Sequence, residues 1–596
     1  MKIIFRQYLA SLRERGELDA VLPDLLSQLG YTVISRPAIG TRQYGVDVAA
    51  IGPAGEGRKQ KLYLFSIKQG DLTRTDWDDG SPQALRPSIN EIVDVYIPTR
   101  IAKAHQKYEI VICLCFGGEV HQAVRDNVTQ FTNQLTRDGL SFEEWNGDRL
   151  AGLLVQGVLR EQLVDKALRT SFRKAVAMVD EPEIAFLHFS KLIEGLCTGA
   201  HATSKQRITA LRQLNICLWV LFVWARDAGN LEAPFRASER ALLYGWHLVH
   251  ADIARGGKSG EEVGAAYFEL SNLHTIIWDA LIGEKILPFV GTKHAISEAV
   301  NSASSLDVNL KLFETLGRIS LHGLNLLWTM NSDAHVPTAR SHWGLVEAQV
   351  DSIAHSIVSL IKSNPILRAP VADHQAVDIA VTLIFLSMMD KWQPAAKSYV
   401  EAMINRVVFA YMTRSRYPTT HGDYRSLIEH CSNRSDEHRE AHTKGSTLFP
   451  LLSLWASSLG ADKSAGYLAE FSEKQLPHCH MQLWFPGPDT EEKLYTGGIR
   501  HGLSFGNIPI TTDGESAIGM LEAECKATSH FAQLSAIRLG HWTNVALACR
   551  HYRLPIPPNL WLALLKQLRA KHMRPSESPP SRAPKRRSRR PVASTP

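Results

Sequence analysis

The sequence predicts an α/β N-terminal domain, followed by a large all-α region, a helical array, and a disordered basic tail. Within residues 1–165, short runs of β-branched and aromatic residues alternate with segments whose apolar residues have helical spacing. From 166 to 565 the strand-like runs nearly vanish and helical spacing dominates. The last segment, 566–596, is basic and becomes rich in Pro, Ser and Arg from 574 onward. Such a composition buries too little apolar surface to fold.

The elements of the N-terminal domain follow from this alternation. An amphipathic helix runs to about Gly30. We expect one mixed sheet built from residues 31–35, 45–52, 61–68 and 109–116, with helices over 83–104 and 119–138 packed against it. A short strand over 140–145 and a helix that Asp148 would cap, continuing to Leu159, complete the domain.

The region from 166 to 565 is predicted to be helical in its long apolar-spaced segments. These are residues 205–228, 237–254, 345–362, 374–391, 396–413, 447–474 and 558–571. Pairs of neighbouring segments resemble antiparallel helix hairpins, which suggests a helical array, although no fixed repeat period is visible.

Composition and charge exclude several classes of protein. The 596 residues are 44% hydrophobic and 21% charged, which is globular and rules out a wholly disordered, collagenous or coiled-coil chain. The net charge is +6, but the tail 566–596 alone carries +9, so residues 1–565 carry −3. A nearly neutral body is not that of a protein that coats nucleic acid along its whole length.

Location is predicted from cysteine usage and hydropathy. The eight cysteines are scattered and form no C-x-x-C pair, which favours a reducing compartment. The N-terminal residues lack the signal-peptide pattern, and the most apolar windows, 214–225 and 376–389, are too short to span a bilayer. We therefore expect a soluble cytoplasmic protein with no membrane partner.

One pattern in the N-terminal domain carries chemistry. Asp47 begins the second predicted strand, and Lys68 ends the third. A turn over 52–61 joins the two strands as a hairpin, so the carboxylate and the ammonium can lie at the same end of it. A carboxylate there can hold Mg²⁺, and a neighbouring Lys can position water or stabilise developing phosphate charge.

This spacing resembles that of the PD-(D/E)XK nuclease superfamily, closest to the restriction-endonuclease branch typified by Mrr. The matching elements are a helix before Gly30-Tyr31, then Gly45-Val46-Asp47, then Ser66-Ile67-Lys68. The resemblance covers about residues 1–165 and implies a restriction-endonuclease-like fold. It also implies Asp19, Asp47, Ser66 and Lys68 as catalytic-site residues.

Two positions depart from the family pattern. Ser66 stands where the family has Glu or Gln, so the metal would be held by Asp47, the Ile67 carbonyl and waters. Asp19 stands where the family has a helix Glu, and a role as helix N-cap is its structural alternative.

The resemblance implies a metal-dependent DNA endonuclease, with Mg²⁺ or Mn²⁺ as cofactor and a prokaryotic restriction or anti-phage role. The helical region would bind a partner protein, a second copy of the chain or the nucleic acid. The alternative is a catalytically degenerate nuclease-like domain that acts as a DNA-binding or protein-interaction scaffold, and Ser66 is the residue that keeps this alternative open.

Three other motifs are outweighed by their context. Gly502–Gly506 matches the G-x-S-x-G nucleophile elbow but lacks the strand before it and the helix after it. Gly257-Lys258-Ser259 lacks the preceding strand and glycine of a phosphate loop, which favours a loop between helices. The adjacent residues His478-Cys479-His480 have no second ligand pair at zinc-finger spacing.

Overall fold

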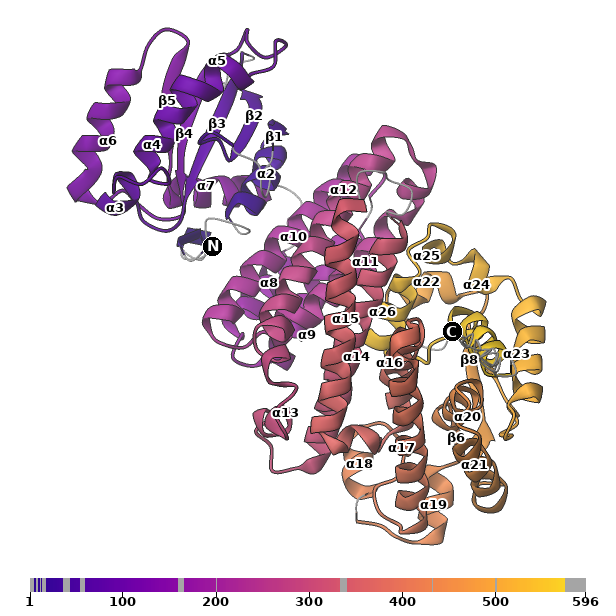
Figure 1. The fold of residues 1–596 in the computed structure, drawn as a ribbon. Coiled ribbons are helices and arrows are strands. Elements are labelled where there is room, and N and C mark those ends of the chain that lie inside the picture. The colour runs from indigo at the N-terminus through magenta and orange to yellow at the C-terminus, as the bar shows by residue number, and fades with distance from the viewer. Residues whose placement is uncertain are drawn as a thin grey trace, which may run out of the picture. The chain divides into compact units, whose positions relative to one another are not determined.

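The structure, a computed structural model, describes most of the chain (Figure 1). The described residues are 5–6, 9–10, 12, 18–35, 43–53, 59–158, 166–199, 201–332, 340–430, 432–498 and 501–573. The segment 574–596, predicted to be disordered, lies outside them. Residues 566–573, counted with the basic tail from sequence, belong instead to helix α27 (Leu562–Met573).

The N-terminal domain contains the predicted mixed sheet. Its strands are β1 (Thr32–Ser35), β2 (Val48–Pro53), β3 (Gln60–Lys68), β4 (Glu109–Phe116) and β5 (Leu140–Trp145), side by side in that order. The pairs β1–β2 and β2–β3 are antiparallel, whereas β3–β4 and β4–β5 are parallel. The parallel pairs require crossovers, which helices provide, whereas a short turn suffices for β2–β3.

Helices cover both faces of the sheet. α4 (Leu85–Glu91) and α6 (Gln122–Leu135) pack on the face that carries Leu62 and Leu64, through residues such as Ile89 and Val124. The opposite face carries Tyr63 and Phe65, and Phe65 meets Trp145 edge to face at 4.9 Å. The mixed α/β prediction is therefore confirmed. Successive side chains of each strand point alternately into two apolar layers, one on each face of the sheet.

The predicted helix over 83–104 is interrupted. α4 passes into a π-helical turn over Ile92–Tyr96 and then into α5 (Ile97–Arg100). Pro98 has no N–H, so the regular hydrogen-bond ladder cannot continue through it, and the turn widens there. α3 (Arg74–Trp77) precedes α4 on the same crossover.

The helix after β5 is capped differently from the prediction. α7 spans Gly147–Val158, and the side chain of Asn146 accepts a hydrogen bond from the amide of Arg149 at 2.9 Å. Asn146 is thus the N-cap, and Asp148 lies within the first turn.

Beyond the N-terminal domain the chain is largely helical, as predicted, and it divides into two compact units. The first unit holds residues 1–289 together with 491–499 and 535–551. Its helices beyond the sheet are α8 (Lys166–Ala177), α9 (Pro182–Cys197), α10 (Ser204–Asp227), α11 (Glu232–Arg255), α12 (Gly257–Trp278), α22 (Thr490–Leu494), α25 (Ser535–Arg538) and α26 (Thr543–His551). Gly257-Lys258-Ser259, expected in a loop, instead form the first turn of α12.

The second unit holds residues 290–490, 500–534 and 552–596. Its helices are α13 (Ala295–Ala299), α14 (Ser305–Ser332), α15 (Arg340–Ser363), α16 (Ala376–Ser387), α17 (Gln393–Met412), α18 (Tyr424–His430), α19 (Asp436–His442), α20 (Leu448–Ser458), α21 (Asp462–Gln475), α23 (Glu515–Ala527), α24 (His530–Gln533) and α27. Two short ladders, β6 (Gly445–Ser446) with β7 (His480–Met481) and β8 (Leu483–Phe485) with β9 (Leu503–Phe505), were not predicted. Ser504 of the G-x-S-x-G match lies within β9 rather than on an elbow.

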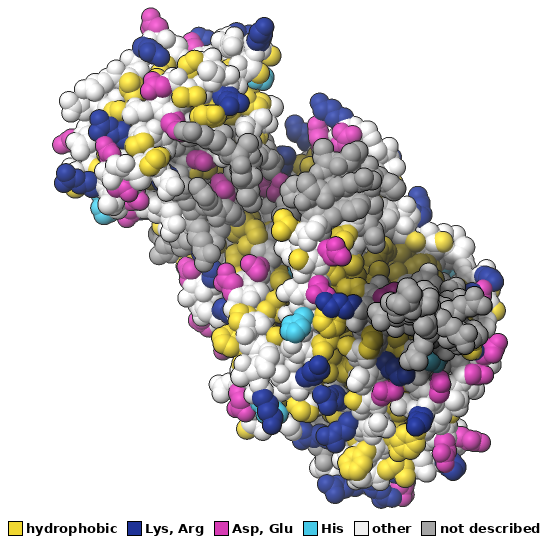
Figure 2. All heavy atoms as spheres, in the orientation of Figure 1, with side chains coloured by type: hydrophobic (Ala, Val, Ile, Leu, Met, Phe, Trp, Pro, Cys, Tyr) yellow, Lys and Arg dark blue, Asp and Glu magenta, His cyan; other side chains and the backbone are white. Residues whose placement is uncertain are grey.

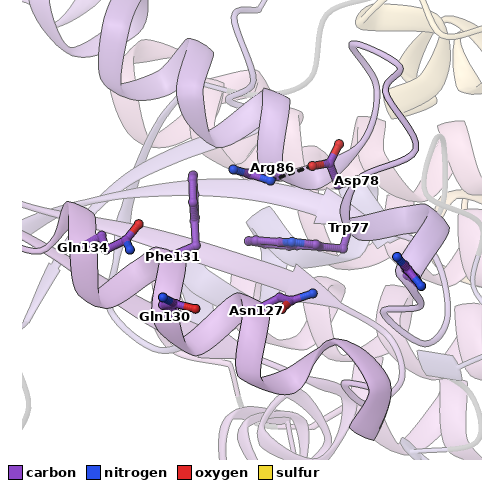
Figure 3. A pocket seen from close by; sticks show the side chains of 8 residues that line it. Trp77, Asp78, Arg86, Asn127, Gln130, Phe131 and Gln134 are labelled. Carbon is purple, nitrogen blue, oxygen red and sulfur yellow. Dashed lines mark hydrogen bonds and ion pairs between the residues drawn. The ribbon is translucent and has the colours of Figure 1, made fainter.

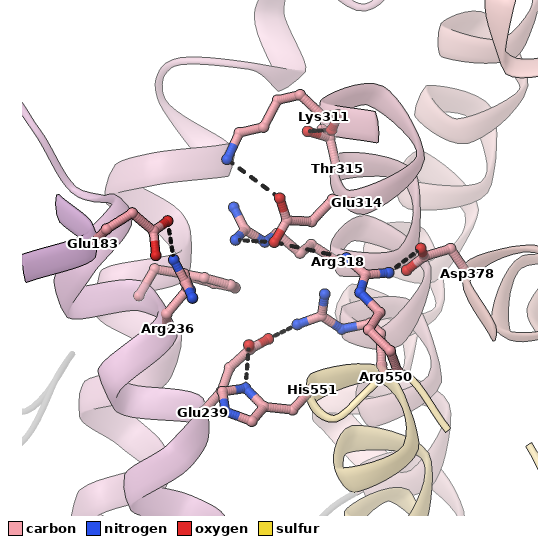
Figure 4. A network of polar contacts seen from close by, with 12 residues as sticks. Glu183, Arg236, Glu239, Lys311, Glu314, Thr315, Arg318, Asp378, Arg550 and His551 are labelled. Atoms are coloured by element: carbon pink, nitrogen blue, oxygen red, sulfur yellow. Dashed lines mark hydrogen bonds and ion pairs between the residues drawn. The ribbon is translucent and has the colours of Figure 1, made fainter. Parts of the chain in front are cut away.

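Ion pairs join distant segments inside each unit (Figure 4). In the first unit, Glu239 of α11 pairs with Arg550 and His551 of α26, and Glu239 and Arg550 are 3% and 2% exposed. In the second unit, Arg553 pairs with Asp378 of α16. The chain between α26 and Arg553 thus passes from one unit's polar network to the other's.

Among the described residues, one helix is long and apolar enough to cross a membrane by length and composition. This helix is α10, and 78% of its most apolar window is buried inside the protein. Its apolar side chains are buried around most of its circumference, which is typical of a core helix in a soluble protein. The cytoplasmic location stays a prediction.

Candidate active site

Asp47 is held at the end of the β2–β3 hairpin by the backbone of β3. Its Oδ2 accepts a hydrogen bond from the amide of Ile67 at 2.7 Å, and its own amide donates to the carbonyl of Phe65 at 2.8 Å. Because Ile67 stands between Ser66 and Lys68, the carboxylate lies beside the stretch of β3 that the sequence predicted as its partner. The hairpin is therefore sufficient to bring these residues together.

The structure explains why glycine is required at position 45, two residues before Asp47. It has a φ of +79°, and a Cβ at this position would lie 2.2 Å from the carbonyl oxygen of Ser88. Only glycine allows the backbone to take this conformation and to approach α4 so closely. The approach fixes the chain just before Asp47.

Ser66 and Lys68 occupy the same face of the sheet. Side chains alternate along β3, so both share the face of Leu64, which packs under α4 and α6. Ser66 is only 2% exposed, whereas Lys68 at the strand end is half-buried. Hydrogen bonds from Ser81 lower the pKa of Asp79, and the charge of Lys68 contributes to that shift, so the ammonium acts on the α3–α4 side of the sheet.

The negative charge of Asp47 acts on a residue of the opposite face of the sheet, the face that carries Phe65. Burial raises the pKa of the Cys115 thiol well above its usual range, and the Asp47 carboxylate adds to the effect. Cys115 pairs in register with Ile67, so it shares the face of Phe65. Asp47 therefore lies directly before β2, and its charge acts on the face of the sheet opposite to Ser66.

Asp19 is the first residue of α2 (Asp19–Gln28), which contacts α7, β1 and β2. The N-cap position belongs to Leu18, so the alternative role of Asp19 as N-cap is wrong. α2 continues through Pro23 without a break.

The donor set fits a divalent cation only in part. Asp47 supplies one carboxylate, and one of its oxygens is already engaged by the Ile67 amide. Ser66 offers a buried hydroxyl in place of a second carboxylate. Mg²⁺ prefers several oxygen ligands and keeps waters, so a single-carboxylate site is chemically possible but weak.

Two cavities lie near this end of the domain. One, of about 510 Å³, follows the ends of β3 and β4, and its lining includes Arg6, Asp71, Glu119 and His121. Asp71 accepts a hydrogen bond from the amide of Glu119 at 2.8 Å. Asp71, Glu119 and His121 were not predicted from sequence because they lie on loops, where no periodicity marks them.

The other cavity, of about 440 Å³, lies between α3 and α6 (Figure 3). Trp77 and Phe131 meet edge to face at 5.4 Å, and Arg86, paired with Asp78 at 2.8 Å, lies over the Phe131 ring. Three side-chain amides of α6 line the same cavity: Asn127, Gln130 and Gln134. Amides and arginines beside aromatic rings are suited to contacts with nucleobases.

The second unit has a basic cavity of about 550 Å³. Figure 2 shows Lys and Arg side chains gathered at the end of this unit that holds α17 to α19. The cavity is lined by Arg406, Arg414, Arg416 and Arg434, together with the exposed ring of Phe409. Such a surface can hold a phosphate and stack a base.

Comparison of the chain with models of protein families, with characterised proteins and with solved structures finds no match. The resemblance to PD-(D/E)XK nucleases therefore rests on the sequence pattern of residues 1–165.

Proposed function

We propose that the chain is a metal-dependent DNA endonuclease of the PD-(D/E)XK type. The observation that carries the proposal is the hydrogen bond from Ile67 to Asp47, which sets a carboxylate beside the Ser66-Ile67-Lys68 stretch. The sheet supports it as well, because an antiparallel hairpin followed by a helical crossover to a parallel strand holds this stretch next to β4.

Each residue has a role in this proposal. Asp47, with the Ile67 carbonyl, would hold Mg²⁺ or Mn²⁺, and a bound ion would polarise the phosphate and activate water. Lys68 would orient that water and offset the negative charge that develops as the phosphodiester bond breaks. Ser66 would fill the family's acidic position with a hydroxyl, and Asp19 would assist from α2.

DNA is the proposed substrate and the basic cavity of the second unit a proposed contact for it. The arginines there are mostly exposed, so they can neutralise phosphates without a large desolvation cost. A role in prokaryotic restriction or anti-phage defence is part of the same proposal.

Cleavage of supercoiled plasmid by the full chain, with Mg²⁺ or with EDTA, tests the proposal. We expect nicking only with the metal, and we expect Lys68→Ala to abolish it. Lys61→Ala is the matched control, because Lys61 lies on the same strand and forms a surface ion pair with Glu109, at 3.1 Å. Equal nicking by wild type and Lys68→Ala would refute the assignment of the site.

The burial of Ser66 favours a second candidate, a domain that binds DNA without cutting it. A buried hydroxyl in the place of an acidic ligand weakens the metal site. Metal-independent retention of the plasmid in a gel-shift assay, without nicking under any tested divalent cation, would establish this candidate in place of the first.

A further inference from the structure

Three histidines of the second unit form a cluster that could hold a metal ion at one point between them. His430 ends α18, and His438 and His442 lie one turn apart on α19. One ring nitrogen from each lies within 4.8 Å of the others. His430 is buried, whereas His438 and His442 are half-buried, so the point is reachable from solvent.

Hydrogen bonding decides which nitrogen of His430 is available. Its Nε2 lies 3.0 Å from the carbonyl oxygen of Tyr417, which can only accept, so Nε2 carries the proton. Nδ1 therefore holds a lone pair, and it faces Nε2 of His438 at 3.3 Å. A carbonyl that orients a histidine in this way is the usual support of a metal ligand.

The separation of these two nitrogens is that of a tetrahedral site. Two nitrogens bound to one Zn²⁺ at about 2.0–2.1 Å in tetrahedral geometry lie about 3.3 Å apart. Without metal, His438 donates its Nε2 proton to Nδ1 of His430; with metal, the proton of His438 moves to its own Nδ1. A change of tautomer thus replaces the hydrogen bond with two metal bonds.

His442 is supported from its other side. Its Nδ1 lies 2.9 Å from the hydroxyl of Thr419, which is fully buried, so Nε2 is the nitrogen directed at the cluster. The rings of His438 and His442 are stacked with centroids 3.8 Å apart. Their spacing of four residues on a helix is the spacing with which paired histidines bind zinc.

Burial disfavours the charged form of two of the three imidazoles. Burial lowers the pKa of His430, and burial followed by the charges of His438 and His421 lowers the pKa of His442 to about 4. Glu429 acts in the opposite direction on His442 and supplies negative charge beside the cluster. The neutral imidazole is the form that binds metal.

We propose that His430, His438 and His442 bind one Zn²⁺ ion, with water in the fourth position. Imidazole nitrogens favour zinc over Mg²⁺, which prefers oxygen. The ion joins α18 to α19 and holds both against the segment that carries Tyr417 and Thr419. Arg434, which lies between the two helices, and Asp436, the first residue of α19, are fixed by the same link. This inference does not depend on the proposed nuclease site.

Co²⁺ and Zn²⁺ titrations of the EDTA-treated full chain test the proposal. We expect one equivalent of Co²⁺ to give the intense visible band of four-coordinate cobalt, and Zn²⁺ to displace it and raise the melting temperature. His438→Gln and His442→Gln should each lower the affinity at least about 10-fold and abolish the zinc-dependent rise in melting temperature.

Two controls make the outcome decisive. His480→Gln alters an exposed histidine of the same unit and should retain the cobalt band, as should Asp47→Asn in the other unit. A wild-type chain that gives only the weak band of octahedral cobalt, or that binds less than half an equivalent, overturns the proposal. So do His438→Gln and His442→Gln variants that bind as tightly as wild type. The wild-type spectrum decides the matter if a variant does not fold.

Discussion

The carboxylate of Asp47 and the amide nitrogen of Ile67 lie 2.7 Å apart, across the β2–β3 hairpin. This contact does two things at once. It satisfies a backbone donor near the end of a buried strand, and it places a negative charge beside the backbone of the stretch Ser66-Ile67-Lys68. A substitution can separate the two roles, because asparagine keeps an acceptor oxygen but has no charge.

Asp47→Asn is therefore expected to leave the melting temperature nearly unchanged and to lower plasmid cleavage by about 10²–10³-fold, the typical cost of one preorganised electrostatic group. Nicking rates and circular dichroism measure the two effects. Asp126→Asn, an exposed acid on α6, is the control and should cut like wild type. A fully active Asp47→Asn would exclude a metal-ligand role for this carboxylate.

Ser66→Glu restores the family's acidic residue at a position that is 2% exposed. Without metal, we expect the buried carboxylate and its added volume to lower the free energy of unfolding by about 1–3 kcal/mol. Mg²⁺ should recover part of that loss, because it binds the carboxylate in the folded state alone. Urea denaturation with and without Mg²⁺ provides the measurement, and Ser66→Ala, which should show no Mg²⁺ dependence, provides the control.

Arg406→Glu and Arg434→Glu are expected to weaken DNA binding through the basic cavity of the second unit. If each arginine contacts one phosphate, the slope of log affinity against log salt concentration should fall by about 0.9 per lost contact. Fluorescence anisotropy at several salt concentrations measures this slope. Lys293→Glu changes an exposed lysine of the same unit away from the cavity. An equal loss in that variant would mean that only net charge matters.

Glu239→Gln tests the buried pair that joins α11 to α26. The change removes one charge from a buried ion pair, and breaking such a pair typically costs about 3–5 kcal/mol. We expect a clear fall in the urea midpoint of the first unit. The exposed pair of Glu470 and Lys474, at 2.6 Å, gives the contrast, since Glu470→Gln should leave the midpoint unchanged.

His322 on α14 predicts a pH dependence of stability. Burial lowers its pKa from 6.5 to about 4, because the charged imidazolium is poorly solvated there. The unfolded chain accepts a proton that the folded chain resists, so this histidine's contribution to stability is present above pH 6.5 and is lost as the pH falls toward 4. Melting temperatures of His322→Leu should fall less steeply over that range than those of wild type. His355→Gln, an exposed histidine, should follow wild type.

The position of Asp47 next to the end of β3 could be predicted from sequence, because the two strands involved are close in the chain. The antiparallel pairing of β2 with β3, which are close in the chain, brings Asp47 to Ile67, and both strands are marked by apolar runs. The face on which each side chain acts was not accessible in the same way. It depends on the helices that cover the sheet, which bury Ser66 and leave Lys68 half-buried at the end of β3.

The cluster of His430, His438 and His442 could not be predicted as a whole from the sequence. His438 and His442 are four residues apart, but no helix was predicted over 436–442, so the spacing alone did not place them on one face. His430 joins the pair only because α18 folds back on α19 and Tyr417 orients its ring. No periodicity in the sequence predicts that α18 and α19 pack against each other.

The sequence by itself determined the mixed sheet, most of the long helices and the pairing of Asp47 with the end of β3. Those features depend on hydrophobic period and on short turns, which act between residues near one another in the chain. Only the tertiary structure decided that residues 535–551 belong with the first unit, through Glu239 and Arg550, and that His430 meets His438. Burial and ion pairing between distant segments depend on how whole helices pack, and a linear pattern of residue types does not specify that packing.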